Sequence, residues 1–292
     1  MTTVSNTAVE LIDEALDEIA RCVTLREIPG ASTHTAIVAY GLEQPNVLVA
    51  LGRYLMGALA GIVGEDARLS AVMLEEGPDA RAELGAAITR LIGDTNDFGT
   101  EKAEHFRDTR RNAWIAEGVA HALLVVRART DTAFLVGPIH ALKAQHSIPS
   151  QQGLDMVAIY SDSSAAVVAI GESKASRNGG SDQLTEAAGM FKKIDEGEYG
   201  VELRAELSSL RKVLSDDLAI QVTGALWRKS RCYLPVIVHE APFELAVRRP
   251  TLGALEPPVE RRRLLALLLS DFHAFFDAVA DAMRAALAEV VI

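Results

Sequence analysis

The first third of the chain has apolar residues at helical spacing. Between residues 9 and 23 they recur with acidic residues between them, at Leu11, Ile12, Ala15, Leu16 and Ile19. This spacing predicts an amphipathic helix. Residues 47–63 and 80–92 are also predicted to be helical, whereas residues 33–40 are β-branched and apolar enough for a strand.

The hydrophobic pattern stops at residues 93–99, which are rich in Gly, Asp and Asn. Such residues favour turns and loops over regular elements. We therefore predict two parts, a mainly helical region over residues 1–98 and a second domain over residues 99–292.

The period of the pattern changes within the second part. A long helical pattern over residues 102–129 gives way to two short runs rich in Val and Ile, residues 154–160 and 166–174. Because Ser161–Ser164 supply turn residues between these runs, the sequence predicts a β-hairpin. The remaining patterns predict helices over 181–194 and 201–214, a strand over 233–239 and a long helix over 261–291. This order of elements is typical of a mixed α/β core.

Composition sets the broad class of protein. Hydrophobic residues make up 49% of the chain and charged residues 24%, the balance of an ordinary globular protein. Cys22 and Cys232 are far apart and lack metal-ligand spacing, and the N-terminal residues lack the pattern of a signal peptide. We therefore expect a reduced, cytoplasmic protein with no membrane association.

Charge is distributed unevenly along the chain. Residues 1–98 contain six Arg, no Lys and fifteen Asp or Glu, which gives them a formal charge of −9 out of the total of −11. Such a region is poorly suited to binding phosphate groups. Residues 99–292 are nearly neutral and contain local basic clusters, so we expect any nucleic-acid surface to lie there or on a partner protein.

The predicted hairpin brings three charged residues together. Side chains alternate across a strand, so Glu172 and Lys174 share a face with Ile170, and pairing of the two strands places Asp155 beside them. Buried charges are costly without partners. A divalent hard cation such as Mg²⁺ would offset the negative charge of two carboxylates at this position. The pattern therefore predicts metal-assisted chemistry on a phosphate ester, with Lys174 offsetting developing charge.

These residues resemble the motif of the PD-(D/E)xK nuclease superfamily. Gly153-Leu154-Asp155, then a hairpin, then Gly171-Glu172-Ser173-Lys174 match an Asp followed on the next strand by Glu-x-Lys, with Leu154 in place of the usual Pro. The resemblance implies a restriction-endonuclease-like mixed sheet flanked by helices and DNA cleavage that depends on Mg²⁺ or Mn²⁺. It further implies a third metal ligand, for which Glu117 is suited, and an auxiliary residue on the following helix, which Gln183 matches.

Within the superfamily, the chain is similar to the DUF1837 family of HamA nuclease subunits from Hachiman anti-phage defence. The similarity covers about twenty residues, Gly-Leu-Asp and Ile-Gly-Glu-Ser-Lys among them, and the overall layout. It implies a nuclease that acts in bacterial anti-phage defence under the control of a helicase-like partner. Residues 1–98 would then be an acidic regulatory or docking region.

Other interpretations of the same residues stay open. A Glu-x-Lys triplet arises about once by chance in a chain of this length, and Glu172 and Lys174 can simply be solvated at a strand end. His146 can approach the metal or phosphate, but no partner spacing supports ligation, which favours a loop or core histidine. Glu117 can face solvent on an amphipathic helix. As a whole, the chain can be a non-catalytic subunit with a nuclease fold, or a hydrolase of small nucleotides.

Overall fold

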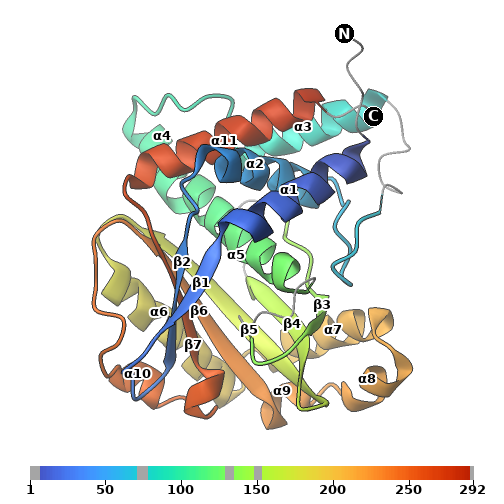
Figure 1. Ribbon diagram of the computed structural model, residues 1–292, viewed down its shortest axis with the longest axis vertical. Coiled ribbons are helices and arrows are strands. Elements are labelled where there is room, and N and C mark those ends of the chain that lie inside the picture. The colour runs from blue at the N-terminus through green and yellow to red at the C-terminus, as the bar shows by residue number, and fades with distance from the viewer. Residues whose placement is uncertain (1–6, 71–77, 129–134, 148–152, 290–292) are drawn as a thin grey trace.

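A seven-stranded mixed sheet runs through the molecule in the order β1-β2-β7-β6-β5-β4-β3 (Figure 1). The structure is a computed structural model that describes residues 7–70, 78–128, 135–147 and 153–289. The strands β2, β7, β6 and β5 are mutually parallel, whereas β1, β4 and β3 join at the two ends in antiparallel pairs. The strands are β1 Thr24–Ile28, β2 Thr35–Tyr40, β3 Ile139–Leu142, β4 Met156–Asp162, β5 Ala165–Ser176, β6 Arg231–His239 and β7 Arg263–Leu268.

Helices cover both faces of this sheet. The first face packs against α1 Ala8–Cys22, α2 Pro45–Leu59, α3 Pro78–Ile92, α5 Asn112–Ala128 and α11 Phe272–Glu289. The second face packs against α6 Gly180–Glu196, α7 Gly200–Leu210, α8 Asp216–Gln221, α9 Leu226–Lys229 and α10 Pro250–Gly253. The expectation of a mixed α/β protein with flanking helices and a C-terminal helix is confirmed.

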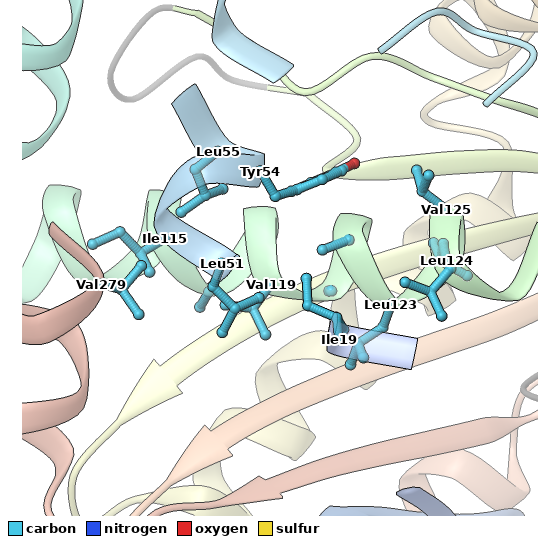
Figure 2. Packing of buried hydrophobic residues seen from close by; sticks show 14 of the residues in the cluster. Ile19, Leu51, Tyr54, Leu55, Ile115, Val119, Leu123, Leu124, Val125 and Val279 are labelled. Carbon is cyan, nitrogen blue, oxygen red and sulfur yellow. The ribbon is translucent and has the colours of Figure 1, made fainter. Parts of the chain in front are cut away.

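The alternation of side chains along each strand builds two cores. In β6, Leu234 and Val236 face the first layer of helices, whereas Tyr233 and Ile237 face the second. The first core is centred on α5, which is rich in Ala, Val and Leu and is buried along most of its length. Figure 2 shows Val119 of this helix packed among side chains from the other helices of the layer.

The beginnings of two helices in the first layer follow from local sequence. The hydroxyl of Thr7 accepts a hydrogen bond from the backbone N–H of Glu10, and the Glu10 carboxylate accepts one from the backbone N–H of Thr7 at 2.8 Å. This reciprocal capping satisfies N–H groups that have no partner within α1. Pro45 begins α2, where its missing N–H and fixed φ cost nothing.

The predicted β-hairpin is confirmed as β4 and β5. The two strands pair antiparallel from Met156 opposite Gly171 to Asp162 opposite Ala165. Ser163 and Ser164 form the turn with φ of 49° and 73°, the left-handed conformation that two-residue hairpin turns require.

The C-terminal segment differs from the prediction at its start. Residues 261–291 were expected to be one helix, but Arg263–Leu268 form the interior strand β7, and α11 begins at Phe272. A parallel strand covered on both faces is apolar on both sides, and such a short run resembles part of a buried helix. The edge strands β1 and β3 were not predicted.

Residues 1–98 are joined to the rest of the chain through the sheet and the core. β2 pairs with β7 in parallel, from Thr35 opposite Arg263 to Ala39 opposite Leu267. Side chains of α1 and α2 belong to the same hydrophobic cluster as those of α5 and α11. A regulatory or docking role for residues 1–98 stays a prediction.

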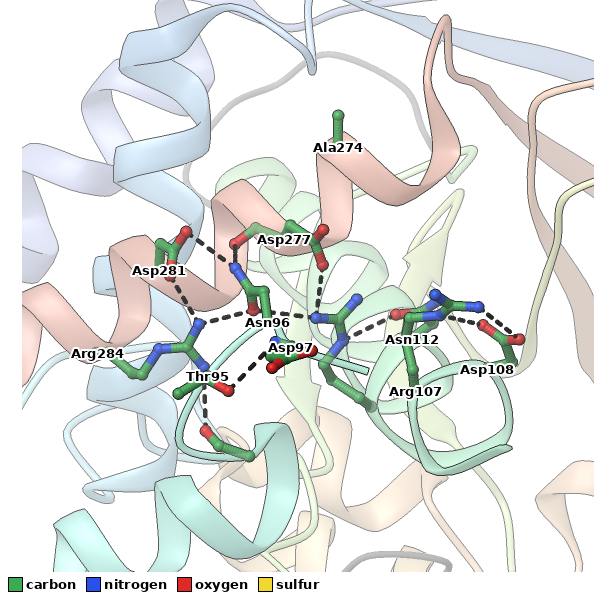
Figure 3. Close-up of polar contacts among 12 residues, drawn as sticks. Thr95, Asn96, Asp97, Arg107, Asp108, Asn112, Ala274, Asp277, Asp281 and Arg284 are labelled. Atoms are coloured by element: carbon green, nitrogen blue, oxygen red, sulfur yellow. Dashed lines mark hydrogen bonds and ion pairs between the residues drawn. The ribbon is translucent and has the colours of Figure 1, made fainter. Parts of the chain in front are cut away.

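The segment 101–128 contains a buried cation. It is helical throughout, with α4 Glu101–Phe106, a π-helical turn η2 Arg107–Arg111 and then α5. The side chain of Arg111 has no exposed surface and forms an ion pair with Asp277 of α11 at 2.7 Å. Figure 3 shows the surrounding contacts, in which Asn96 accepts a hydrogen bond from Arg284 at 2.7 Å and donates one to Asp281 at 2.9 Å. The network ties the loop at residues 93–99 to α11.

No helix among the described residues is long and apolar enough to cross a bilayer.

Candidate active site

The site lies where β4 begins and β5 approaches its end. Asp155 directly precedes β4, and the strand register places it beside Glu172 of β5. One oxygen of Asp155, Oδ2, accepts a hydrogen bond of 2.8 Å from the backbone N–H of Ser173. The hairpin therefore fixes the position of Asp155 through its own backbone.

Glu172 and Lys174 project from the same face of β5. This face carries Val168 and Ile170, which are buried against the second layer of helices. Lys174 Nζ lies 3.1 Å from Glu172 Oε1 and 2.7 Å from Glu186 Oε1 on α6. The Glu172 carboxylate is 11% exposed and the Glu186 carboxylate 61%, so Lys174 lies between a buried and an exposed carboxylate.

Glu117 supplies a third carboxylate from α5. Its charge acts on both Asp155 and Glu172. Glu117 Oε2 lies 3.1 Å from Nδ1 of His146, in the segment after β3. This segment is held against α5 because Trp114 Nε1 donates to the His146 carbonyl at 2.9 Å and Gln145 Nε2 donates to the Trp114 carbonyl at 3.0 Å.

The grouping of carboxylates perturbs their protonation. Burial, together with the charges of Glu117 and Glu172, raises the pKa of Asp155 to about 9. Burial also raises the pKa of Glu172, although Lys174 opposes this shift. Burial alone would lower the pKa of Lys174, but its contacts with Glu186 and Glu172 raise it, so the side chain is a cation at neutral pH.

The carboxylates suit a hard cation. Glu172 Oε2 is buried without a hydrogen-bond partner among the described residues, and Glu117 Oε2 is buried against Nδ1 of His146. Buried oxygens without partners lose their hydration, and Mg²⁺ prefers carboxylate oxygens and waters as ligands. Within the described ranges, no group of three or more His, Cys, Asp or Glu is arranged closely enough to be recognised as a ready-made metal site.

The structure thus brings together the residues that the sequence singled out. Asp155, Glu172, Lys174 and Glu117 converge, and His146 contacts Glu117. Whether they catalyse a reaction stays a prediction.

The helix after β5 contacts the candidate site through a residue that was not predicted from the sequence. Gln183, the predicted auxiliary residue, is half-buried in the first turn of α6. The contact with Lys174 comes from Glu186, three residues further on. Residues three apart share a helix face. A helix that turns Gln183 towards the site therefore turns Glu186 towards it as well, so the sequence did contain this signal.

No protein-family model matches the chain, and a search of curated proteins found no match.

Proposed function

We propose that this protein is a metal-dependent DNA nuclease with a restriction-endonuclease-like core, and that Asp155, Glu172 and Lys174 form its catalytic centre. One observation carries the proposal: the buried carboxylate of Glu172, the partly buried carboxylates of Asp155 and Glu117 and the ammonium group of Lys174 converge at the end of one hairpin. Of these groups, Glu172 Oε2 is buried without a hydrogen-bond partner among the described residues. Strongly perturbed carboxylates gathered around one point are typical of functional sites.

Each residue of the proposed centre would have a distinct role. Asp155, Glu172 and Glu117 would hold Mg²⁺ or Mn²⁺. Such an ion, when bound, polarises a phosphoryl oxygen and lowers the pKa of water. The Ser173 N–H holds Asp155 in place, and His146 orients Glu117. Lys174 would stabilise the negative charge that grows on the phosphate oxygens as water attacks.

We further propose a cytoplasmic role in bacterial anti-phage defence, in which a helicase-like partner delivers DNA and controls cleavage. The support is the resemblance of the segment around Asp155 and Glu172 to the nuclease subunits of Hachiman systems. The charge of −11 also supports it, because a chain so acidic is expected to need help to hold DNA.

The test compares two Glu–Lys pairs. Glu172→Gln and Lys174→Ala should each lower Mg²⁺-dependent cleavage of plasmid DNA by about a hundredfold or more, with melting temperatures within a few degrees of the wild type. Glu196→Gln and Lys192→Ala are matched controls, because this pair on α6 is exposed and 3.8 Å apart. The controls should keep full activity.

The dependence of cleavage on metal ions gives a second test of the proposed centre. This test does not require the helicase-like partner. EDTA should stop cleavage, and calorimetric titration should show Mg²⁺ binding that Glu172→Gln weakens. Undiminished cleavage by both site variants, or in EDTA, would rule out the proposed centre. Binding of DNA without cleavage, even with the helicase-like partner present, would instead favour a non-catalytic subunit.

A further inference from the structure

Glu186 contacts the proposed centre although the proposed reaction gives it no role. It lies on the flank of α6 that also carries Gln183 one turn earlier, whereas Leu184 and Ala187 are buried against the second face of the sheet. Glu186 Oε1 accepts a hydrogen bond of 2.7 Å from Lys174 Nζ. Among the described residues, Lys174 is the one hydrogen-bond and ion-pair partner of this carboxylate. The contact therefore joins α6 to β5 at the edge of the site.

The two carboxylates that contact Lys174 are held very differently. Glu172 is 11% exposed and lies within β5, which is paired with β4 on one side and with β6 on the other. Separating a buried ion pair leaves an uncompensated charge, so this contact is expected to persist. Glu186 is 61% exposed, and exposed ion pairs contribute little to stability because water and salt screen them. Lys174 thus has one fixed anionic partner and one that can be exchanged.

A phosphate group would need the contact that Glu186 makes. A lysine ammonium has three N–H donors, and in this structure it is directed at Glu172 and Glu186. Carboxylate and phosphate oxygens are both anionic acceptors for such a donor. The Lys174 side chain is 23% exposed, which leaves little surface for a second anion beside Glu186. A phosphate that approaches Lys174 from solvent therefore competes with the Glu186 carboxylate.

We propose that Glu186 occupies the place of the substrate phosphate on Lys174 and that DNA displaces it on binding. This inference rests on the proposed function, in which Lys174 meets the phosphate. Glu186 then acts on the substrate through Lys174 and sets the affinity for DNA. It does not set the rate of the chemical step, because its carboxylate has already left Lys174 when DNA is bound.

The first experiment separates affinity from rate. Glu186→Gln keeps the size of the side chain and removes its charge. Single-turnover cleavage with Mg²⁺ is measured over a range of protein concentrations. The concentration that gives the half-maximal rate should fall about fivefold in the variant, because the exposed contact no longer has to be broken. The maximal rate should stay within about twofold of the wild type, because saturating DNA displaces the carboxylate in any case.

A control variant and a double variant show whether the gain depends on Lys174. Glu196→Gln removes the same charge from the same helix, where its carboxylate is 55% exposed and lies 3.8 Å from Lys192. Its affinity for DNA should equal that of the wild type. In a Lys174→Ala background, Glu186→Gln should gain no more affinity than this control, because the two side chains no longer interact.

These affinities are measured by fluorescence anisotropy in EDTA, where the proposed cleavage stops. The probe is a labelled oligonucleotide at low salt, single-stranded or annealed to its complement, whichever binds the wild type more tightly. Melting temperatures of all variants within a few degrees of the wild type would show that the fold is intact.

Four outcomes would overturn the inference. They are equal DNA affinity of the wild type and Glu186→Gln, no DNA binding by Glu186→Gln even at low salt, an equal gain in the Lys174→Ala background, and a lower maximal rate with unchanged affinity. The third would show general charge repulsion, and the fourth would show that Glu186 positions Lys174 for the reaction. An affinity gain that depends on Lys174 in a protein that never cleaves DNA would contradict the proposed nuclease activity and support the competition for Lys174.

Discussion

Asp155 shows how a candidate catalytic residue can lower the stability of the fold that holds it. Its pKa rises from the ordinary value of 3.8 to about 9 because of burial and the neighbouring Glu117 and Glu172. The folded protein therefore keeps a proton that the unfolded chain releases between these pH values. The contribution of Asp155 to folding stability decreases as the pH rises from about 4 towards 9.

We predict that Asp155→Asn raises the melting temperature at pH 8 by a few degrees while cleavage is lost. The amide keeps an acceptor for the Ser173 N–H but cannot ionise. The gain should shrink towards pH 4, where the wild-type carboxyl is protonated in both states. Millimolar Mg²⁺ should raise the melting temperature of the wild type more than that of the variant. A variant that melts at or below the wild-type temperature at pH 8 would contradict this account.

At the residue scale, the sequence predicts contacts that strand geometry alone determines. The proximity of Asp155 and Glu172 follows from a hairpin and from alternation along its strands. The hydrogen bond from the Ser173 N–H and the ion pair with Glu186 do not follow, because they depend on the local path of the backbone and on how α6 packs over β5.

At the scale of the elements, the hydrogen bonds of His121 connect α5 to α2 and to the segment after β3. Its Nε2 lies 2.9 Å from the Lys143 carbonyl and therefore donates, so Nδ1 accepts from the Tyr54 hydroxyl at 2.5 Å. Both contacts require a neutral ring. Burial lowers the pKa of His121 from 6.5 to about 4.

We predict a loss of stability in acid that depends on His121. Because the folded pKa is lowered, its contribution is complete above pH 6.5 and is lost as the pH falls towards 4. Between pH 7.5 and pH 5 the wild type should lose about 2 kcal/mol more unfolding free energy than His121→Gln does. Urea titrations at the two pH values measure this difference. Parallel losses in both proteins would show that His121 does not titrate in this range.

A second prediction at this scale concerns the ion pair between η2 and α11. Asp277→Ala leaves the fully buried Arg111 without its carboxylate and should cost about 3–5 kcal/mol of unfolding free energy. Asp281→Ala is the matched control on the same helix, because its carboxylate is 66% exposed and pairs with Arg284 at 2.7 Å. The control should cost about 1 kcal/mol or less. Equal costs in urea titrations would show that burial of Arg111 does not determine the effect.

Elements with a strong period were predicted, and elements without one were not. The helix around Leu11 and the hairpin of β4 and β5 have clear spacing in the sequence. The strand β7 lacks such spacing because both of its faces are buried, and the edge strands β1 and β3 are too short to establish a period. The pairing of β2 with β7 joins segments more than 200 residues apart, which no local pattern reveals.

At the scale of the whole molecule, the acidic first third cannot simply be removed to test its role. Loss of residues 1–98 would expose one edge of β7 and the side of α11 that packs on α2. A shortened chain that fails to cleave DNA would therefore report misfolding as readily as regulation. Neutral substitutions of exposed carboxylates keep the sheet and core intact.

We predict that the wild type alone binds duplex DNA weakly at physiological salt, because like charges oppose association with phosphates. Asp17→Asn, Glu83→Gln and Asp94→Asn combined change three exposed residues of the first third and should raise affinity several-fold at low salt. A control with the same net charge combines Glu198→Gln, Glu202→Gln and Asp216→Asn, which are exposed around α7 and α8. Fluorescence anisotropy with a labelled duplex measures both variants over a series of salt concentrations.

The distribution of charge decides the expected difference between these variants. At physiological ionic strength, charges separated by more than about 8 Å through solvent are largely screened, so only carboxylates close to the DNA path lower the affinity. If the first third opposes DNA binding, its variant gains more affinity than the control, and the gain disappears as salt rises. Equal gains would show that net charge alone acts and that residues 1–98 have no special role. Tight binding and unrestrained cleavage by the wild-type chain alone would show instead that the protein is an autonomous nuclease.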